Sequence, residues 1–311
     1  MKKRLLKWLF LHFNLNGYWN TKRFMSGIIT FTTDWGIGDP YAALFKAHVW
    51  RVHPGAVFAD ISHDVHNGSR LHAAYLLSSA CWAFPEETVH VVDVRELTSD
   101  QLRKVANRER PLPFLDFLAV RCREQFFLLE NNGILSLIDP EFANLHEVVK
   151  LAAHADYNQY NTFNALNYYA DAAARLSAGC RLSELGEPYP EQWLERMVLP
   201  ALTPTENSVG GRILHIDARG NLITDIREPL LLSVAQSRKK LTVQVGRMFE
   251  RLKDFRLCKR YLSVAEGKGF AVVNASGYVE LGQKNASLAA TLYGSDDLRS
   301  GIGDSVTLMF E

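Results

Sequence analysis

The sequence lacks features that mark several common classes of protein. Its four cysteines are widely spaced and form no C-x-x-C pair, so neither a disulfide framework nor a cysteine-based zinc site is indicated. The 35 lysines and arginines are balanced by 34 aspartates and glutamates, and they form no basic stripe of the kind that binds a phosphate backbone. We therefore expect a protein of the reducing cytoplasm that does not bind nucleic acid.

Long apolar runs are also missing, so no transmembrane span is expected. The first 25 residues begin with "MKKRLLKWLF", where Lys7 interrupts an apolar stretch that is too short to cross a bilayer. No small-residue cleavage site follows, which argues against a signal peptide. We treat residues 1–25 as an N-terminal extension, either a floppy segment or an amphipathic helix lying on a surface.

Several catalytic and cofactor motifs are absent as well. Without G-x-G-x-x-G or a P-loop, an ordinary dinucleotide or triphosphate site is not indicated, and without G-x-S-x-G a serine nucleophile has no support. The histidines of "SHDVHNGSRLH", His63, His66 and His72, match no standard zinc spacing. Loop and helix-surface positions explain them better, so we expect no metal and no bound cofactor.

What is present is enough apolar sequence, 47% of 311 residues, for two cores. The first part of the chain alternates strands and helices with short connections, which is typical of a parallel α/β sheet. The expected strands are 27–33, 56–61, 88–94, 117–122 and 125–130, and the expected helices are 40–52, 69–83, a short one after "NNG", and 168–179. Residues 95–115 are charged and predict an excursion loop with one helical turn.

Four prolines between residues 186 and 210 indicate a domain boundary. The short β-branched runs that follow, separated by turn residues, predict a small antiparallel barrel or sandwich. We therefore expect a parallel-sheet α/β domain over residues 26–190 and an antiparallel β-barrel domain over residues 205–311.

Two aspartates stand five positions apart in "TTDWGIGDPY". Asp34 falls at the carboxyl end of the first predicted strand, where open α/β sheets bind ligands and where a carboxylate can accept hydrogen bonds from a ribose diol. Asp39 precedes Pro40 and also fits a helix N-cap, which is a purely structural role. Asp93 ends another predicted parallel strand, so the same geometry brings it to the same crevice unless it only caps a loop.

Two turns in the second part of the sequence carry further polar residues. "IDARGNLITDI" places Asp217 and Asn221 around a glycine, and "VNASGYVELGQKNASLA" offers Asn274 and Ser276 around another turn. Taken alone, each is explained by a hairpin or a barrel corner.

Together these segments resemble the S-adenosyl-L-methionine (SAM) hydroxide adenosyltransferase family, the SAM hydrolases, whose relatives include the SAM-dependent fluorinase and chlorinase. Seven segments follow the family's order: "TFTTDWGIGDPY", "ADISHDV", "AFPEETVHVVD", "ENNGIL", "TFNALNYYADAAARLSAG", "HIDARGNLITDI" and "NASGYVELGQKNASLA". The resemblance implies a homotrimer in which SAM, as substrate, lies between the first domain of one subunit and the second domain of its neighbour.

The resemblance also implies roles for individual residues. Asp34 would hold the ribose hydroxyls, and Asp39 the methionine end. Asp217 and Asn221 would bind the methionine amine and the adenine. The remaining implied substrate-binding residues come from the "TFNALN" and "NASGY" segments: Thr162, Phe163, Asn274, Ala275 and Ser276. The implied reaction is attack of water or hydroxide at the 5′ carbon of SAM, giving adenosine and methionine.

The chain departs from the family at the catalytic positions. Family hydrolases carry an Asp, an Arg seven residues later and a His in "TFHGRD". Asp93 is retained, but the position seven residues on is Asp100, so Arg95 or Arg103 would have to substitute. Asn164 stands where the His is expected, and an amide cannot accept a proton at neutral pH.

Three hypotheses follow from this pattern. The first is a SAM-cleaving enzyme in which Asp93 and Asn164 hold the attacking water. The second is a protein that binds SAM or adenosine with little or no catalysis. The third is halide-dependent adenosyl transfer, for which Ala165 leaves room but offers no side-chain donor.

Overall fold

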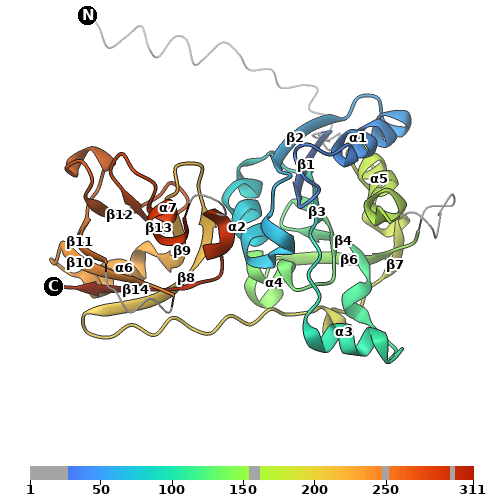
Figure 1. The fold of residues 1–311 in the computed structure, drawn as a ribbon. Helices are drawn as coiled ribbons and strands as arrows, with labels where there is room; N and C mark the ends of the chain where they lie inside the picture. The colour runs from blue at the N-terminus through green and yellow to red at the C-terminus, as the bar shows by residue number, and fades with distance from the viewer. Residues whose placement is uncertain (1–26, 154–161, 247–251, 295–297) are drawn as a thin grey trace, which may run out of the picture.

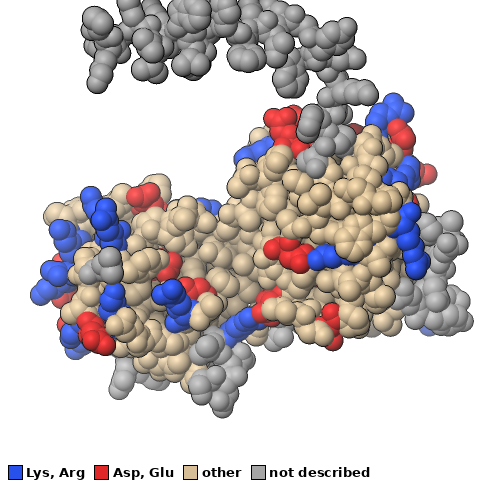
Figure 2. Space-filling model, turned by 90° about the horizontal axis from the view of Figure 1, so that it is seen from above, with Lys and Arg blue, Asp and Glu red and all other residues tan. Residues whose placement is uncertain are grey.

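The computed structural model describes residues 27–153, 162–246, 252–294 and 298–311, and the predicted N-terminal extension lies outside them. An α/β part and a barrel part lie side by side, joined by an extended segment (Figure 1). None of the described helices is both long and apolar enough to cross a membrane. On the face seen in Figure 2, basic and acidic side chains are scattered among uncharged surface.

The α/β part is built on a seven-stranded sheet in the order β2-β1-β3-β5-β4-β6-β7. Its strands are β1 (Ile28–Thr33), β2 (Val57–Ser62), β3 (Val89–Asp93), β4 (Phe117–Cys122), β5 (Gln125–Glu130), β6 (Leu145–Leu151) and β7 (Gly186–Pro188). β2, β1, β3 and β5 run parallel, whereas β4 is antiparallel to both of its neighbours. The predicted α/β class is therefore confirmed, and the parallel strands bring their carboxyl ends to one edge.

Helices cover both faces of this sheet. α1 (Tyr41–Val52) and α5 (Asn164–Ser177) pack on one face, and α2 (Arg70–Ala80) and α4 (Ile134–Ile138) pack on the other. The buried side chains of β1 and β3 alternate between the two cores: Ile29, Phe31, Val89 and Val91 face α1 and α5. α5 begins four residues before the predicted helix and ends as expected, with Gly179 in the left-handed conformation.

The excursion after β3 contains more helix than expected. α3 (Ser99–Ala106) is eight residues long, and it starts with a capping box. Thr98 accepts from the Gln101 backbone N–H, and the Gln101 side chain accepts from the Thr98 backbone N–H. The prediction of a single helical turn was wrong because this cap, visible in the sequence as T-x-x-Q, was not taken into account.

The barrel part is a closed seven-stranded barrel in the order β10-β11-β12-β13-β9-β8-β14. Its strands are β8 (Ser208–Ile216), β9 (Leu222–Arg227), β10 (Lys240–Val245), β11 (Leu252–Leu257), β12 (Gly269–Val273), β13 (Tyr278–Gln283) and β14 (Ser305–Phe310). The barrel is confirmed, but β11 pairs in parallel with β12, so it is mixed rather than wholly antiparallel. Two helices, α6 (Glu228–Ala235) and α7 (Leu288–Tyr293), add to its core.

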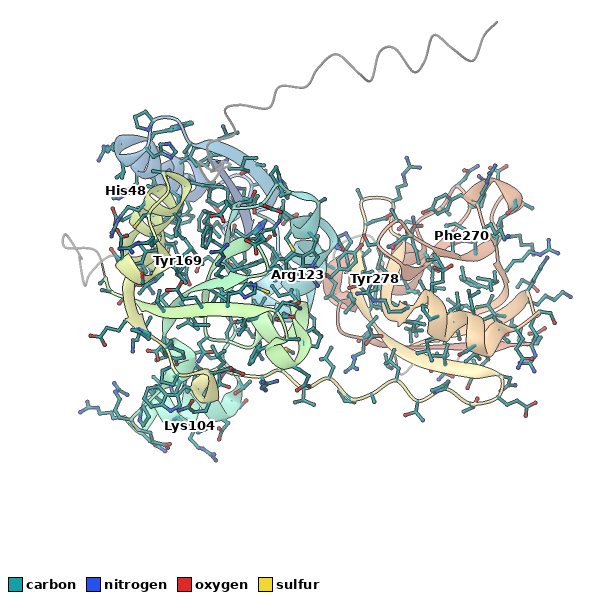
Figure 3. The ribbon with its side chains drawn as sticks, turned by 180° about the vertical axis from the view of Figure 1, so that it is seen from behind. His48, Lys104, Arg123, Tyr169, Phe270 and Tyr278 are labelled. Atoms are coloured by element: carbon teal, nitrogen blue, oxygen red, sulfur yellow. The ribbon has the colours of Figure 1, made fainter. Side chains whose placement is uncertain are left out.

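α2 contributes to the contact between the two parts. Tyr75 packs against a small cluster that includes Tyr278 of β13, which Figure 3 shows on the side of the barrel facing the α/β part. Beside it, His72 Nε2 lies 2.7 Å from His215 Nδ1. The His66 backbone N–H donates to His72 Nδ1, so His72 Nε2 carries the hydrogen and donates to His215. His72 is thus buried, which corrects its expected place on a helix surface.

Candidate functional site

A cavity of about 400 Å³ opens at the edge where the parallel strands end. We call it the strand-end cavity. Its walls come from the loop after β1, the end of β3 and the start of α5, which is where ligands of open α/β sheets bind. The lining residues are Asp34, Trp35, Asp39, Tyr41, Asp93, Arg95, Thr162, Phe163 and Asn164.

Asp93, the last residue of β3, pairs with Thr33, the residue before Asp34, and the Asp34 backbone nitrogen lies 3.4 Å from the Asp93 carbonyl oxygen. Desolvation of the carboxylate by the surrounding protein is the largest effect on Asp34, and the negative charge of Asp93 is the next. Together they raise the pKa of Asp34 from 3.8 to about 6. Burial also raises the pKa of Asp93, against the opposing effects of Trp35 and Arg95. The predicted crevice with two strand-end carboxylates is therefore present, and each is a stronger base than an ordinary carboxylate.

Asp39 lines the same cavity and does not cap α1. The helix begins at Tyr41, Pro40 occupies the position before it, and no side chain caps this end. The Asp39 carboxylate instead lies against Gly36, where a Cβ would stand 2.7 Å from Oδ2. Gly36 is thus required by its left-handed backbone and by the approach of Asp39. The structural explanation for Asp39 was wrong, and its side chain is left facing the cavity.

Arg95 supplies the positive charge of the cavity. Its Nε donates to Glu130 Oε2 at 3.0 Å, and a second guanidinium nitrogen pairs with Glu130 Oε1. Glu130 is buried at the end of β5, the strand next to β3. Arg103 instead lies on the exposed side of α3, paired with Asp100. Of the two arginines left open by the sequence, Arg95 is the one at the site.

The start of α5 forms the remaining wall. Thr162, Phe163 and Asn164 line the cavity, as the resemblance implied. Asn164 is the first residue of the helix, and no side chain caps this end. Ala165 is fully buried in the core beneath and does not line the cavity.

A second cavity, of about 720 Å³, lies in the barrel part, and we call it the barrel cavity. Asp217 and Asn221 line it and also hold the turn between β8 and β9. Asp217 Oδ1 accepts from the Asn221 backbone N–H at 2.8 Å, and Asn221 Nδ2 donates to Glu280 at 2.9 Å. Gly220 cannot carry a side chain, because a Cβ would stand 1.9 Å from Ser287 Oγ. The structure therefore brings Asp217 and Asn221 together, as predicted, but it places them in a different cavity from Asp34 and Asp93.

The "NASGY" turn lies elsewhere. Asn274 Oδ1 accepts from the backbone N–H groups of Ser276 and Tyr278, which makes it the centre of the turn between β12 and β13. The Asn274 side chain also hydrogen-bonds Tyr75 of α2. Asn274, Ala275 and Ser276 thus line neither cavity in this chain.

Sequence reasoning missed several residues that line the two cavities, and also Glu130, the partner of Arg95. Trp35 and Tyr41 lie inside the quoted "TTDWGIGDPY", but only its aspartates were considered. Glu130 was visible as an acidic residue ending an apolar strand, yet its place beside Asp93 depends on the strand order. Tyr261 and Glu280, which line the barrel cavity, were not singled out because they belong to no motif that was assigned a role.

The family models agree with this architecture. The model of the SAM hydroxide adenosyltransferase N-terminal domain matches residues 29–186, and that of the C-terminal domain matches residues 211–305. The chain belongs to the SAM hydroxide adenosyltransferase family. The strand-end cavity lies in the part matched by the first model, and the barrel cavity lies in the part matched by the second.

Named relatives are distant. The chain is 26% identical to an (R)-S-adenosyl-L-methionine hydrolase of Thermus thermophilus over 273 residues, 85% of this chain and 94% of that protein. It is 21% identical to one of Methanocaldococcus jannaschii over 259 residues, 82% and 87% of the two chains. An uncharacterized conserved protein of Thermotoga maritima has a similar fold, with a TM-score of 0.74, 24% identity, and coverage of 90% of this chain and 99% of that one.

Proposed function

We propose that this chain cleaves SAM by attack of water or hydroxide at the 5′ carbon, giving adenosine and methionine. The observation that carries the proposal is the convergence of Asp34, Asp93 and Asn164 on one cavity. Membership of the family supports SAM as the substrate, and the activity named for the relatives supports the reaction.

The two strand-end carboxylates have different tasks in this proposal. Asp34 accepts hydrogen bonds from the ribose hydroxyls. Trp35 donates to Asp93 Oδ2, so Oδ1 is the oxygen that accepts a hydrogen bond from the attacking water. Burial raises the pKa of Asp93, which makes this carboxylate a better proton acceptor. Asn164 orients the same water but cannot take its proton.

The bond changes are simple. The water oxygen forms a bond to the 5′ carbon, the bond from that carbon to sulfur breaks, and its electron pair stays on sulfur. The proton of the water passes to Asp93 and then to solvent. Since a sulfonium cation becomes a neutral sulfide, a cavity that solvates the starting cation poorly favours the step.

We also propose that one SAM molecule bridges two copies of the chain within a homotrimer. The strand-end cavity and the barrel cavity share no lining residue and belong to different parts of the chain. Asp217 and Asn221 of a neighbouring copy would then complete the site that Asp34 and Asp93 begin. Light scattering that reports a stable monomer with undiminished SAM binding would contradict this arrangement.

A second function, binding of SAM or adenosine without turnover, is favoured by one observation. No histidine is found among the described residues that line the strand-end cavity, and Asn164 takes the position where the family has one. The proton acceptors among the described lining residues are then carboxylates alone.

The deciding experiment is incubation of the purified protein with SAM in ¹⁸O-labelled water. Adenosine that carries the label at its 5′ oxygen supports hydrolysis, and Asp93→Asn should abolish it. Asp254→Asn, an exposed change in the barrel part, serves as the control and should leave the rate unchanged. SAM binding without products would favour the second function, and calorimetry that finds neither SAM nor adenosine bound would overturn both.

A further inference from the structure

Trp35 makes a hydrogen bond that no sequence motif assigns to it. Its indole Nε1–H donates to Asp93 Oδ2 at 2.6 Å. We propose that Trp35 is the positioning residue for Asp93: it fixes which carboxylate oxygen faces the cavity and stabilises the ionised form. This inference rests on the proposed function, in which Asp93 receives the proton of the attacking water.

The Trp35 ring is held by packing on several sides. It is 7% exposed and lies 4.9 Å from the Phe163 ring in a T-shaped contact. The Phe31 and Phe45 rings lie 5.8 and 5.5 Å away on the core side. His63 stacks on the indole at 5.6 Å with 17° between the planes. A ring fixed in this way aims its N–H in one direction, so little freedom is lost in making the bond to Asp93.

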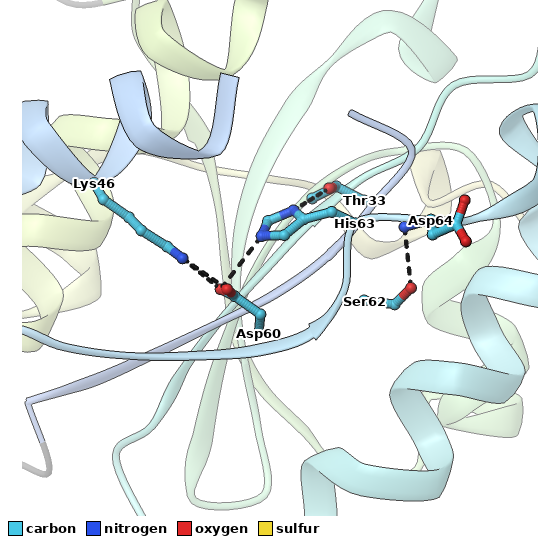
Figure 4. A network of polar contacts seen from close by, with 6 residues as sticks. All are labelled: Thr33, Lys46, Asp60, Ser62, His63 and Asp64. Atoms are coloured by element: carbon cyan, nitrogen blue, oxygen red, sulfur yellow. Dashed lines mark hydrogen bonds and ion pairs between the residues drawn. The ribbon is translucent and has the colours of Figure 1, made fainter. Parts of the chain in front are cut away.

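His63 is itself fixed by the polar network of Figure 4. Thr33 Oγ1 lies 2.8 Å from His63 Nδ1, and Asp60 Oδ1 lies 3.3 Å from Nε2. Lys46 binds Asp60 at 2.7 Å, which ends the network at the surface. Burial lowers the pKa of His63, so the ring stacked on Trp35 is neutral at neutral pH and adds no charge beside Asp93.

The ionised form of Asp93 depends on this bond because its two charged neighbours, Asp34 and Arg95, have opposite effects on it. Asp34 raises the cost of a second negative charge, whereas Arg95 favours it. Tyr169, from α5, faces Asp93 and Arg95 with a buried hydroxyl. Among the described residues, Trp35 is the one side chain that hydrogen-bonds the Asp93 carboxylate. Removing its N–H leaves a buried carboxylate without a donor, which favours the protonated form.

The test compares Trp35→Phe with Trp50→Phe. Phenylalanine keeps an aromatic ring at residue 35 but removes the N–H donor together with part of the indole volume. Trp50 is 48% exposed and donates to the Ala56 carbonyl oxygen, so its replacement is the matched control. Two measurements are made: carboxyl ¹³C NMR titration of Asp93, and the rate of adenosine formation from SAM against pH.

In Trp35→Phe we expect the pKa of Asp93 to rise by about one unit, a tenfold gain in proton affinity. The acid limb of the kcat profile should move upward by the same amount, with KM for SAM changed less than about threefold. Trp50→Phe should change neither. An unchanged Asp93 titration in a folded Trp35→Phe protein would overturn the inference.

The NMR measurement separates this inference from the proposed function. If the wild type forms no adenosine, the function fails, but the titration of Asp93 still decides the role of Trp35. If Trp35→Phe does not fold, the indole N–H resonance of Trp35 in the unmutated protein decides instead. It should move as Asp93 titrates, and an indole signal that ignores that titration would refute the hydrogen bond as the controlling contact.

Discussion

Replacing Tyr169 by phenylalanine should make the protein more stable. Tyr169 is fully buried in α5, between the helix and the sheet (Figure 3), and its hydroxyl has no hydrogen-bond partner among the described residues. An unpaired buried polar group costs about 1 to 3 kcal/mol, whereas the ring contact with Phe117, 5.4 Å between centroids, survives the change. We therefore expect Tyr169→Phe to raise the free energy of unfolding by about 1 to 3 kcal/mol.

Tyr189 provides a control in which the same atom is removed with the opposite result. Its hydroxyl accepts from Asn131 at 3.2 Å and donates to the Asp116 carboxylate at 2.9 Å. Tyr189→Phe removes the hydrogen bond to Asp116 Oδ2, although Asn131 Nδ2 keeps two carbonyl acceptors, and it should lower the free energy of unfolding by about 1 to 3 kcal/mol. Urea unfolding followed by circular dichroism at pH 7 measures both variants. If Tyr169→Phe also destabilises the protein, its hydroxyl is paired and the reasoning is refuted.

Three further predictions concern the site and the contact between the two parts. Asp34→Asn should weaken adenosine binding by about 1.5 to 3 kcal/mol, the strength of a hydrogen bond to a charged group, and equal affinities by calorimetry would exclude that role. Asn164→His should speed adenosine formation, since a positioned general base contributes about 10² to 10⁴-fold; a SAM-binding variant that stays inert would favour the binding function. Burial lowers the pKa of His72 from 6.5 to about 3 and that of His215 from 6.5 to about 4, so below pH 6.5 the unfolded chain gains these protons first. The free energy of unfolding should therefore fall as the pH drops from 6.5 to 4, and His215→Asn should flatten that slope; an identical slope would contradict the assignment.

The sequence predicted the fold where hydrophobic periodicity was strong. Five of the seven strands of the α/β sheet and the helices α1 and α2 were expected to within three residues, whereas β6 and β7 were not predicted and α5 starts earlier than expected. β11 was missed because charged residues interrupt its alternation in "LKDFRL", and α6 and α7 were missed because six to eight residues give too short a pattern. A parallel pair inside the barrel could not be expected from strand composition alone.

The candidate site was predicted in part for a similar reason. A strand end can be found along the sequence, and this was sufficient to place Asp34 and Asp93 together. Partners that come from another strand depend on the order of the strands in space, which is why Glu130 was not linked to Arg95. The role of Trp35 depends on the direction of one N–H bond, and that direction is set by tertiary packing rather than by any local pattern.

The link between Arg299 and Asp64 bears on how far the two parts can be separated. Arg299, in the last turn before β14, pairs with the Asp64 carboxylate and donates to its carbonyl oxygen at 3.3 Å. Asp64 follows directly on His63, whose ring supports Trp35. The α/β part has its own core, but without the barrel part the loop after β2, which carries Asp64, would lose this contact. The barrel part therefore stabilises a loop next to the strand-end cavity, although none of its described residues lines that cavity in the same chain. The two parts are not independent modules.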